Sequence, residues 1–149
     1  RILQTGRIDD IHTRPADAFV GRLIGSPSMA FFRAELADGA VHVPGWRDAL
    51  DLTRFGAIAA QPGTVSLGIW PEDIDLGKDG ESGRIYAVDN RGYEAAVQVD
   101  CEAGSFRKVL EGKHVPHQGE TVSFRLRPGS GFLFHPVSGE LLSHQGNER

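Results

Sequence analysis

The sequence predicts a mostly β protein, a small barrel or sandwich with short helices confined to its N-terminal part. Short apolar segments with turn-forming neighbours recur along residues 30–142, and glycines mark many of the turns between them. A helical spacing of apolar residues stands out only before residue 29. The chain has 149 residues and a hydrophobic content of 40%, which suits one ordinary globular domain with a core.

The N-terminal segment is expected to form two short helices. Residues 7–14 fit one or two helical turns that stop before Pro15, because a residue that precedes proline disfavours helix. A second helix follows, with one apolar stripe made by Phe19, Val20, Leu23 and Ile24. Gly25 can close this helix, and Pro27 prevents its return. The pattern therefore predicts an amphipathic helix with an abrupt end at Gly25, Ser26 and Pro27.

The rest of the chain is expected to consist of short strands. Asp38-Gly39 is the strongest hairpin turn, and turns are also expected at Asn90-Arg91-Gly92 and Ser138-Gly139. Residues 46–60 could form either a helical turn or irregular chain, and the acidic segment 70–81 is interpreted as a solvated loop. The predicted strands cover residues 30–36, 40–43, 64–69, 83–90, 92–101, 105–112, 119–126, 131–136 and 140–142.

Composition argues against several classes of protein. The net charge of −4 does not suit a nucleic-acid-binding protein, which usually carries a basic surface. The apolar runs are too short to span a bilayer, and the N-terminus does not resemble a secretory signal. The single cysteine, Cys101, excludes an internal disulfide and is interpreted as an inert, half-buried thiol.

Motifs that carry catalysis are missing from the sequence. No phosphate loop, nucleophile elbow or zinc-protease helix occurs. His114 and His117 are three apart, but Pro116 between them disfavours helical presentation, and they are interpreted as surface loop residues. The acidic segment 70–81 lacks the ligand alternation of a calcium loop. No catalytic, cofactor or metal residues are therefore assigned.

Three segments read together resemble a known family. They are RILQTGRIDDIHTRPADAFVGRLIGSPSM, TVSLGIWPEDI, and GETVSFRL followed by GFLFHPVSGELL. Their order resembles the C-terminal regulatory domain of ABC-importer ATPases of the maltose and glycerol-phosphate type, which carries an OB-like TOBE module. The matching positions are Pro15, Ala16, Phe19, Val20, Ile24, Gly25, Ser26, Pro27, Met29, Gly68, Ile69, Pro71, Glu72, Leu133, Phe134 and Gly139.

The resemblance implies a domain organisation and a role. Residues 1–29 would be the tail of an ATPase domain with a crossing helix, residues 30–143 an OB-like TOBE regulatory domain, and residues 144–149 a flexible tail. The chain begins at Arg1 rather than Met, so it is expected to be a piece of a larger protein. The residues expected to act as a lever between the ATPase body and the regulatory barrel are Phe19, Val20, Ile24, Gly25, Ser26, Pro27 and Met29.

The same resemblance implies the partners. They are the chain's own ATPase domain, a second copy in a homodimer, the membrane permease subunits and a regulatory protein, but no nucleic acid. ATP and magnesium would bind only in the missing ATPase domain, so this chain would hold no cofactor and would not be an enzyme itself. The parent would serve sugar transport at the cytoplasmic side of the inner membrane.

Four positions depart from the family pattern: Ala30, Trp70, Phe132 and His135. Trp70 replaces Arg and Phe132 replaces His, which suggests that a polar pair became an aromatic pair. We expect both rings to be at least half buried, and to touch or share a neighbour. The alternative is an exposed Trp70 and an unrelated core Phe132. The interface or regulatory candidates are Trp70, Glu72, Phe132 and Phe134.

Two alternative functions would each require a particular set of residues. An oxyanion-binding TOBE module would need convergent backbone N–H groups with hydroxyls, for which the candidates are Thr64, Ser66, Thr121 and Ser123. A nucleic-acid-binding barrel would need a basic groove with stacking aromatics, which the acidic balance argues against.

Overall fold

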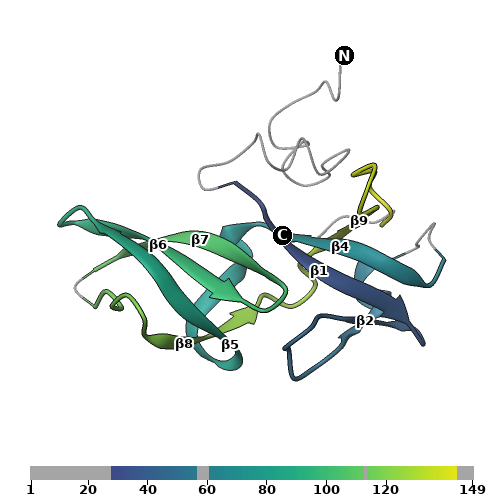
Figure 1. The fold of residues 1–149 in the computed structure, drawn as a ribbon, viewed down its shortest axis with the longest axis horizontal. Coiled ribbons are helices and arrows are strands. Elements are labelled where there is room, and N and C mark those ends of the chain that lie inside the picture. The colour runs from purple at the N-terminus through teal and green to yellow at the C-terminus, as the bar shows by residue number, and fades with distance from the viewer. Residues whose placement is uncertain (1–27, 57–60, 113, 144–149) are drawn as a thin grey trace, which may run out of the picture.

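The computed structural model describes residues 28–56, 61–112 and 114–143. They form one antiparallel sheet of nine strands, with the neighbour order β3-β2-β1-β7-β6-β5-β8 and with β4 between β1 and β9. Figure 1 shows β5 to β8 on the left and β1, β2, β4 and β9 on the right, and β1 pairs with β7 where the two groups meet. The prediction of a mostly β chain is therefore confirmed.

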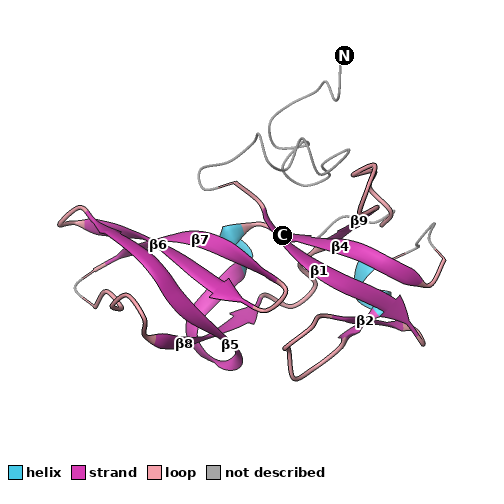
Figure 2. Ribbon diagram, viewed as in Figure 1, coloured by secondary structure: helices cyan, strands magenta, loops and turns pink. Residues whose placement is uncertain are grey.

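The element bounds follow the glycine-marked turns closely. The strands are β1 Ala30–Ala37, β2 Ala40–His42, β3 Leu50–Asp51, β4 Gly63–Ile69, β5 Ile74–Asn90, β6 Glu94–Cys101, β7 Gly104–Glu111, β8 Thr121–Leu126 and β9 Phe132–Phe134. The two helices are 3-10 turns, η1 Leu52–Phe55 and η2 Pro71–Asp73, and Figure 2 shows how small they are beside the strands. Within the described ranges, no helix is long and apolar enough to cross a membrane.

The hairpin turns form because their residues accept left-handed backbone. Asp38 and Gly39 have φ of 54° and 73°, and the β1–β2 register closes directly on them at Ala37 and Ala40. At the other hairpin, Gly92 has φ of 92°, and Asn90 pairs with Ala95. Both predicted turns are confirmed.

The main core lies on one face of the sheet and is rich in aromatic rings. Phe32, Trp46, Phe106 and Phe124 contact one another edge to face, with ring centroids between 5.1 and 6.3 Å apart. Cys101 is half buried at the edge of this core. Burial raises the pKa of its thiol more than the nearby Trp46 indole lowers it.

Two expectations about the strands need correction. Residues 74–81 of the segment predicted as a solvated loop are not a loop, because they begin β5, a strand of 17 residues. β5 pairs with β8 over Ile74–Arg84 and then with β6 over Arg84–Asn90, with an irregularity between Leu76 and Glu81. The ambiguous segment 46–60 contains β3 and η1 in its described part. The predicted helices of residues 1–27 lie outside the described residues.

Candidate functional site

A second apolar cluster lies on the face of β1, β4 and β9 that points away from the main core. Phe32, Leu67 and Leu133 are cross-strand neighbours in the main core. Successive side chains of a strand point to opposite faces, so Phe132 and Phe134 point away from it. The cluster consists of buried Met29, Trp70, Phe132 and Phe134, with Phe31 and Leu141 packed against it.

The close packing of this cluster depends on Gly68. The rings of Phe31 and Phe134 meet edge to face with their centroids 5.7 Å apart, and the ring centroids of Phe132 and Phe134 are 6.5 Å apart. A Cβ atom at Gly68 would lie 2.6 Å from both the Met29 Sδ and the Phe134 ring. The glycine therefore lets a sulfur and a ring sit directly on the strand backbone.

The predicted burial of Trp70 and Phe132 is confirmed, since each side chain is only 1% exposed. Both belong to the cluster that also contains Phe134, so the alternative of an exposed Trp70 is wrong. Of the four interface candidates only Glu72 is exposed. Among the lever candidates Met29 is buried in the cluster, and Phe19, Val20, Ile24, Gly25, Ser26 and Pro27 lie outside the described residues.

A polar network holds the turn that follows Trp70. Asp73 is buried, and its carboxylate lies 3.3 Å from the Arg127 guanidinium. The Arg127 backbone N–H donates to the Asp73 carbonyl at 2.7 Å. Arg54 donates to the carbonyls of Ser130 and Arg127 at 2.7 and 2.9 Å. Burial lowers the pKa of Arg54, and the charge of Asp73 opposes this effect. The network fastens η1 and η2 to the segment between β8 and β9.

Lys108 provides a second attachment for the same turn. Its ammonium group donates to the Pro71 carbonyl at 2.9 Å. Burial lowers the pKa of Lys108. The negative charges of Asp75 and Glu72 act in the opposite direction, but their effect is smaller. The sequence carried no local signal for either attachment, because the joined residues are distant along the chain. Arg54 and Ser130, for example, are 76 positions apart.

A hollow of about 470 Å³ opens beside the second cluster, between residues 28–31 and residues 104–107. It adjoins the point where the described chain begins. Gly104 allows β1 and β7 to approach closely here, since a Cβ atom would lie 2.4 Å from the Phe31 carbonyl oxygen. The hollow and the second cluster thus lie side by side where β1 pairs with β7.

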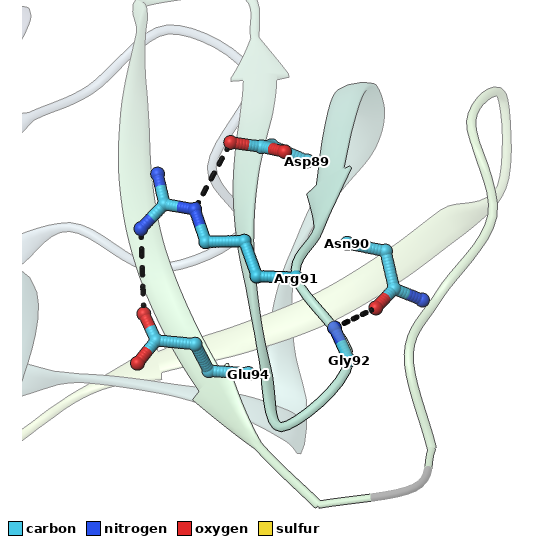
Figure 3. A network of polar contacts seen from close by, with 5 residues as sticks. All are labelled: Asp89, Asn90, Arg91, Gly92 and Glu94. Carbon is cyan, nitrogen blue, oxygen red and sulfur yellow. Dashed lines mark hydrogen bonds and ion pairs between the residues drawn. The ribbon is translucent and has the colours of Figure 1, made fainter.

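The tip of the β5–β6 hairpin is held by its own polar side chains (Figure 3). The Arg91 guanidinium lies 3.1 Å from Asp89 and 3.4 Å from Glu94. The Asn90 side chain accepts from the Gly92 backbone N–H at 2.9 Å. These contacts leave Tyr93, 76% exposed, at a tip of defined shape.

The other candidates from the sequence are not brought together. Thr64 and Ser66 lie on β4, which pairs with β1 and β9, whereas Thr121 and Ser123 lie on β8, which pairs with β5. The Thr64 hydroxyl donates to Glu35 instead, at 2.8 Å.

The two histidines, His114 and His117, are exposed in the segment before β8. In the part of the chain that the structure describes, no three His, Cys, Asp or Glu side chains are grouped to hold a metal ion.

Comparison with known proteins identifies the domain. Residues 67–134 match the model of the TOBE domain. An uncharacterized ABC transporter ATP-binding protein of Sinorhizobium fredii is 30% identical over 93% of this chain. An sn-glycerol-3-phosphate import ATP-binding protein of Paracoccus denitrificans is 30% identical over 87% of this chain. A diacetylchitobiose uptake system ATP-binding protein of Streptomyces coelicolor is 30% identical over 90% of it. The chain spans 38%, 36% and 41% of these relatives.

Proposed function

Because residues 67–134 are a TOBE domain, in a chain that matches the C-terminal region of importer ATP-binding proteins, we propose that the chain is an accessory, regulatory domain of such a subunit. The solutes of the parent would be sugars or related compounds. The observation that carries the proposal is the extent of the match, which covers most of this chain and about two fifths of each relative. The OB-like barrel implied by the resemblance belongs to the same proposal.

The geometry supports attachment to another domain at the second cluster. Met29 is 4% exposed and packs with Trp70, Phe132 and Phe134 immediately after the chain enters the described part. A displacement of the upstream chain at Met29 would therefore act on a rigid, close-packed group rather than on a loop. Residues 1–29, with the lever candidates, would connect this group to an ATPase body.

The proposal places the other partners outside this chain. ATP and magnesium would bind the ATPase domain, and the permease subunits would contact the parent at the cytoplasmic side of the membrane. A second copy would pair with this one across a two-fold axis, and a regulatory protein could use the exposed faces. Nucleic acid is not among the expected partners, given the net charge of −4.

Two measurements test the proposal. The gene sequence upstream of the Arg1 codon should encode a phosphate loop, whose backbone N–H groups and lysine hold nucleotide phosphates. Its absence from an open reading frame that continues upstream would contradict the assignment to an ATP-binding subunit.

Calorimetric titration of this chain with Mg-ATP should give only the heat of dilution. The described residues supply neither a glycine-rich loop before a helix nor a lysine placed for phosphates. Saturable binding with a Kd in the micromolar range, on the order of −8 kcal/mol, would contradict this expectation.

A further inference from the structure

The pairing between β1 and β7 is short and opens into the first hollow. It comprises only Phe31 with Ser105 and Phe32 with Gly104. If the same register continued, Ala30 would oppose Phe106 and Met29 would oppose Arg107. These positions instead line the hollow of about 470 Å³. The two strands therefore part at Ser105. Phe106 and Arg107 border the hollow, whereas Lys108, the next residue of β7, contacts the Pro71 carbonyl.

A second hollow, of about 400 Å³, lies on the outward face of β5, β6 and β7. Its floor contains the small side chains of Ala87 and Ala96, which stand on neighbouring strands. Val109, opposite Ala96 in the register, is 36% exposed at the margin. Arg107 lines both hollows, so the two adjoin at this residue, and together they are called the groove below.

Arg107 is the uncompensated charge of this groove. Among the described residues, no other charged residue lines the first hollow. In the second, Asp89 and Arg91 form an ion pair with each other at 3.1 Å. Arg107 is exposed, and its guanidinium makes no hydrogen bond or ion pair with any residue of the described ranges. A ligand that fills the groove would therefore meet one free guanidinium between two mostly neutral hollows.

We propose that this groove docks an extended, acidic segment of a partner protein, whose carboxylate pairs with Arg107. Charge complementarity selects the acidic side chain, because a planar guanidinium binds a carboxylate through two parallel hydrogen bonds. The end of the β1–β7 pairing favours a partner with an extended backbone, because a peptide strand can add to a β-sheet where the pairing between two strands stops.

This inference does not depend on the identity of the upstream domain. Loss of the ABC-subunit assignment would leave the groove and its charge unchanged, and failure of the peptide test would leave the gene-sequence test unaffected. The two ideas can thus be separated by experiment.

The test uses the isotope-labelled whole chain and two short blocked peptides, acetyl-Thr-Val-Glu-Val-Thr-amide and its counterpart with Gln in place of Glu. NMR titration should show amide shifts confined to residues 28–31 and 104–109 for the Glu peptide. The Gln peptide should bind about fivefold to tenfold more weakly, because it lacks the charge-assisted pair. Raised ionic strength should weaken the Glu peptide more than the Gln peptide.

Matched variants assign the effect to one side chain. Arg107→Gln should reduce the affinity for the Glu peptide to that for the Gln peptide. Arg84→Gln removes another exposed arginine, which lines neither hollow, and should leave the affinity unchanged. Arg107→Glu should instead favour a peptide with Lys at the central position. Since Arg107 is exposed, all three variants should keep the wild-type spectrum elsewhere.

Three results would overturn the proposal. Equal affinities for the Glu and Gln peptides would show that a carboxylate is not recognised. An equal loss of affinity in the Arg107→Gln and Arg84→Gln variants would show that the peptide does not bind at Arg107. Acetate that produced the same shifts at the same concentration would show a small-anion site rather than a peptide groove.

Discussion

Gly68 shows how one residue without a side chain holds the second cluster together. Its missing Cβ leaves room for the Met29 Sδ and the Phe134 ring, each 2.6 Å from where that atom would lie. We expect Gly68→Ala to force both groups to move and to reduce the free energy of unfolding by about 1–3 kcal/mol. Urea denaturation followed by tryptophan fluorescence measures this change.

A double-mutant cycle provides the control for Gly68. Met29→Ala should be destabilising alone, because it leaves a cavity, but it should also make space for the added methyl group of Gly68→Ala. The combined loss should therefore be smaller than the sum of the two single losses. Strict additivity would show that the sulfur and the new Cβ atom do not compete for one space.

Arg54 is a polar residue whose loss should be costly. It donates three hydrogen bonds, two of them to backbone carbonyls, between η1 and the β8–β9 connection. Arg54→Met would leave those acceptors without this donor and should lower the free energy of unfolding by about 1–3 kcal/mol. Arg91→Met removes an arginine of exposed ion pairs and should change stability little. Similar losses for the two variants would contradict the structural role of Arg54.

The β5–β6 hairpin shows, at the scale of the element, how a turn sets its own shape. Gly92 has φ of 92°, a conformation that L side chains rarely adopt. We expect Gly92→Ala to strain the tip by about 1 kcal/mol or more. Hydrogen exchange should speed up for the amides of residues 90–95 and stay unchanged near Ile85 and Val99. Faster exchange throughout β5 and β6 would show instead that the tip controls the whole pair.

Local rules predicted the hairpins but not the full length of β5. The turns at Asp38-Gly39 and Asn90-Gly92 were visible because the residues that form them are adjacent. Residues 74–81 carry acids and glycines, which are poor strand formers, and this composition predicts a loop. They form a strand because β8 pairs with them on both sides of an irregularity, and this pairing overrides their weak propensity.

The candidate site was predictable only in part, and for a related reason. The resemblance pointed to Trp70 and Phe132, whose burial the structure bears out. It could not point to Asp73 with Arg127, 54 positions apart, or to Arg54 with Ser130. Such pairs depend on where whole segments pack, which periodicity and spacing do not report. The sequence likewise gives no sign of a role for Arg107, because that role depends on where β1 and β7 separate in the folded chain.

At the scale of the whole molecule, we expect weak self-association. The proposed two-fold pairing of regulatory domains would be isologous, and this chain spans only about two fifths of its relatives. Much of the area buried by a complete subunit would then be missing, which lowers affinity. Sedimentation velocity should show a concentration-dependent shift towards a dimer. A strict monomer at the highest soluble concentration would contradict the pairing.

The second cluster also joins two distant parts of the sequence. Met29 lies near the start of the described chain and Leu141 near its end, yet both belong to that one cluster. A domain whose ends meet in this way can be inserted into, or removed from, a longer polypeptide as a cassette, because the host chain needs to bridge only a small gap. Evolution could therefore transfer this sheet between host proteins without rebuilding either one, and protein engineers could circularly permute it by linking those ends.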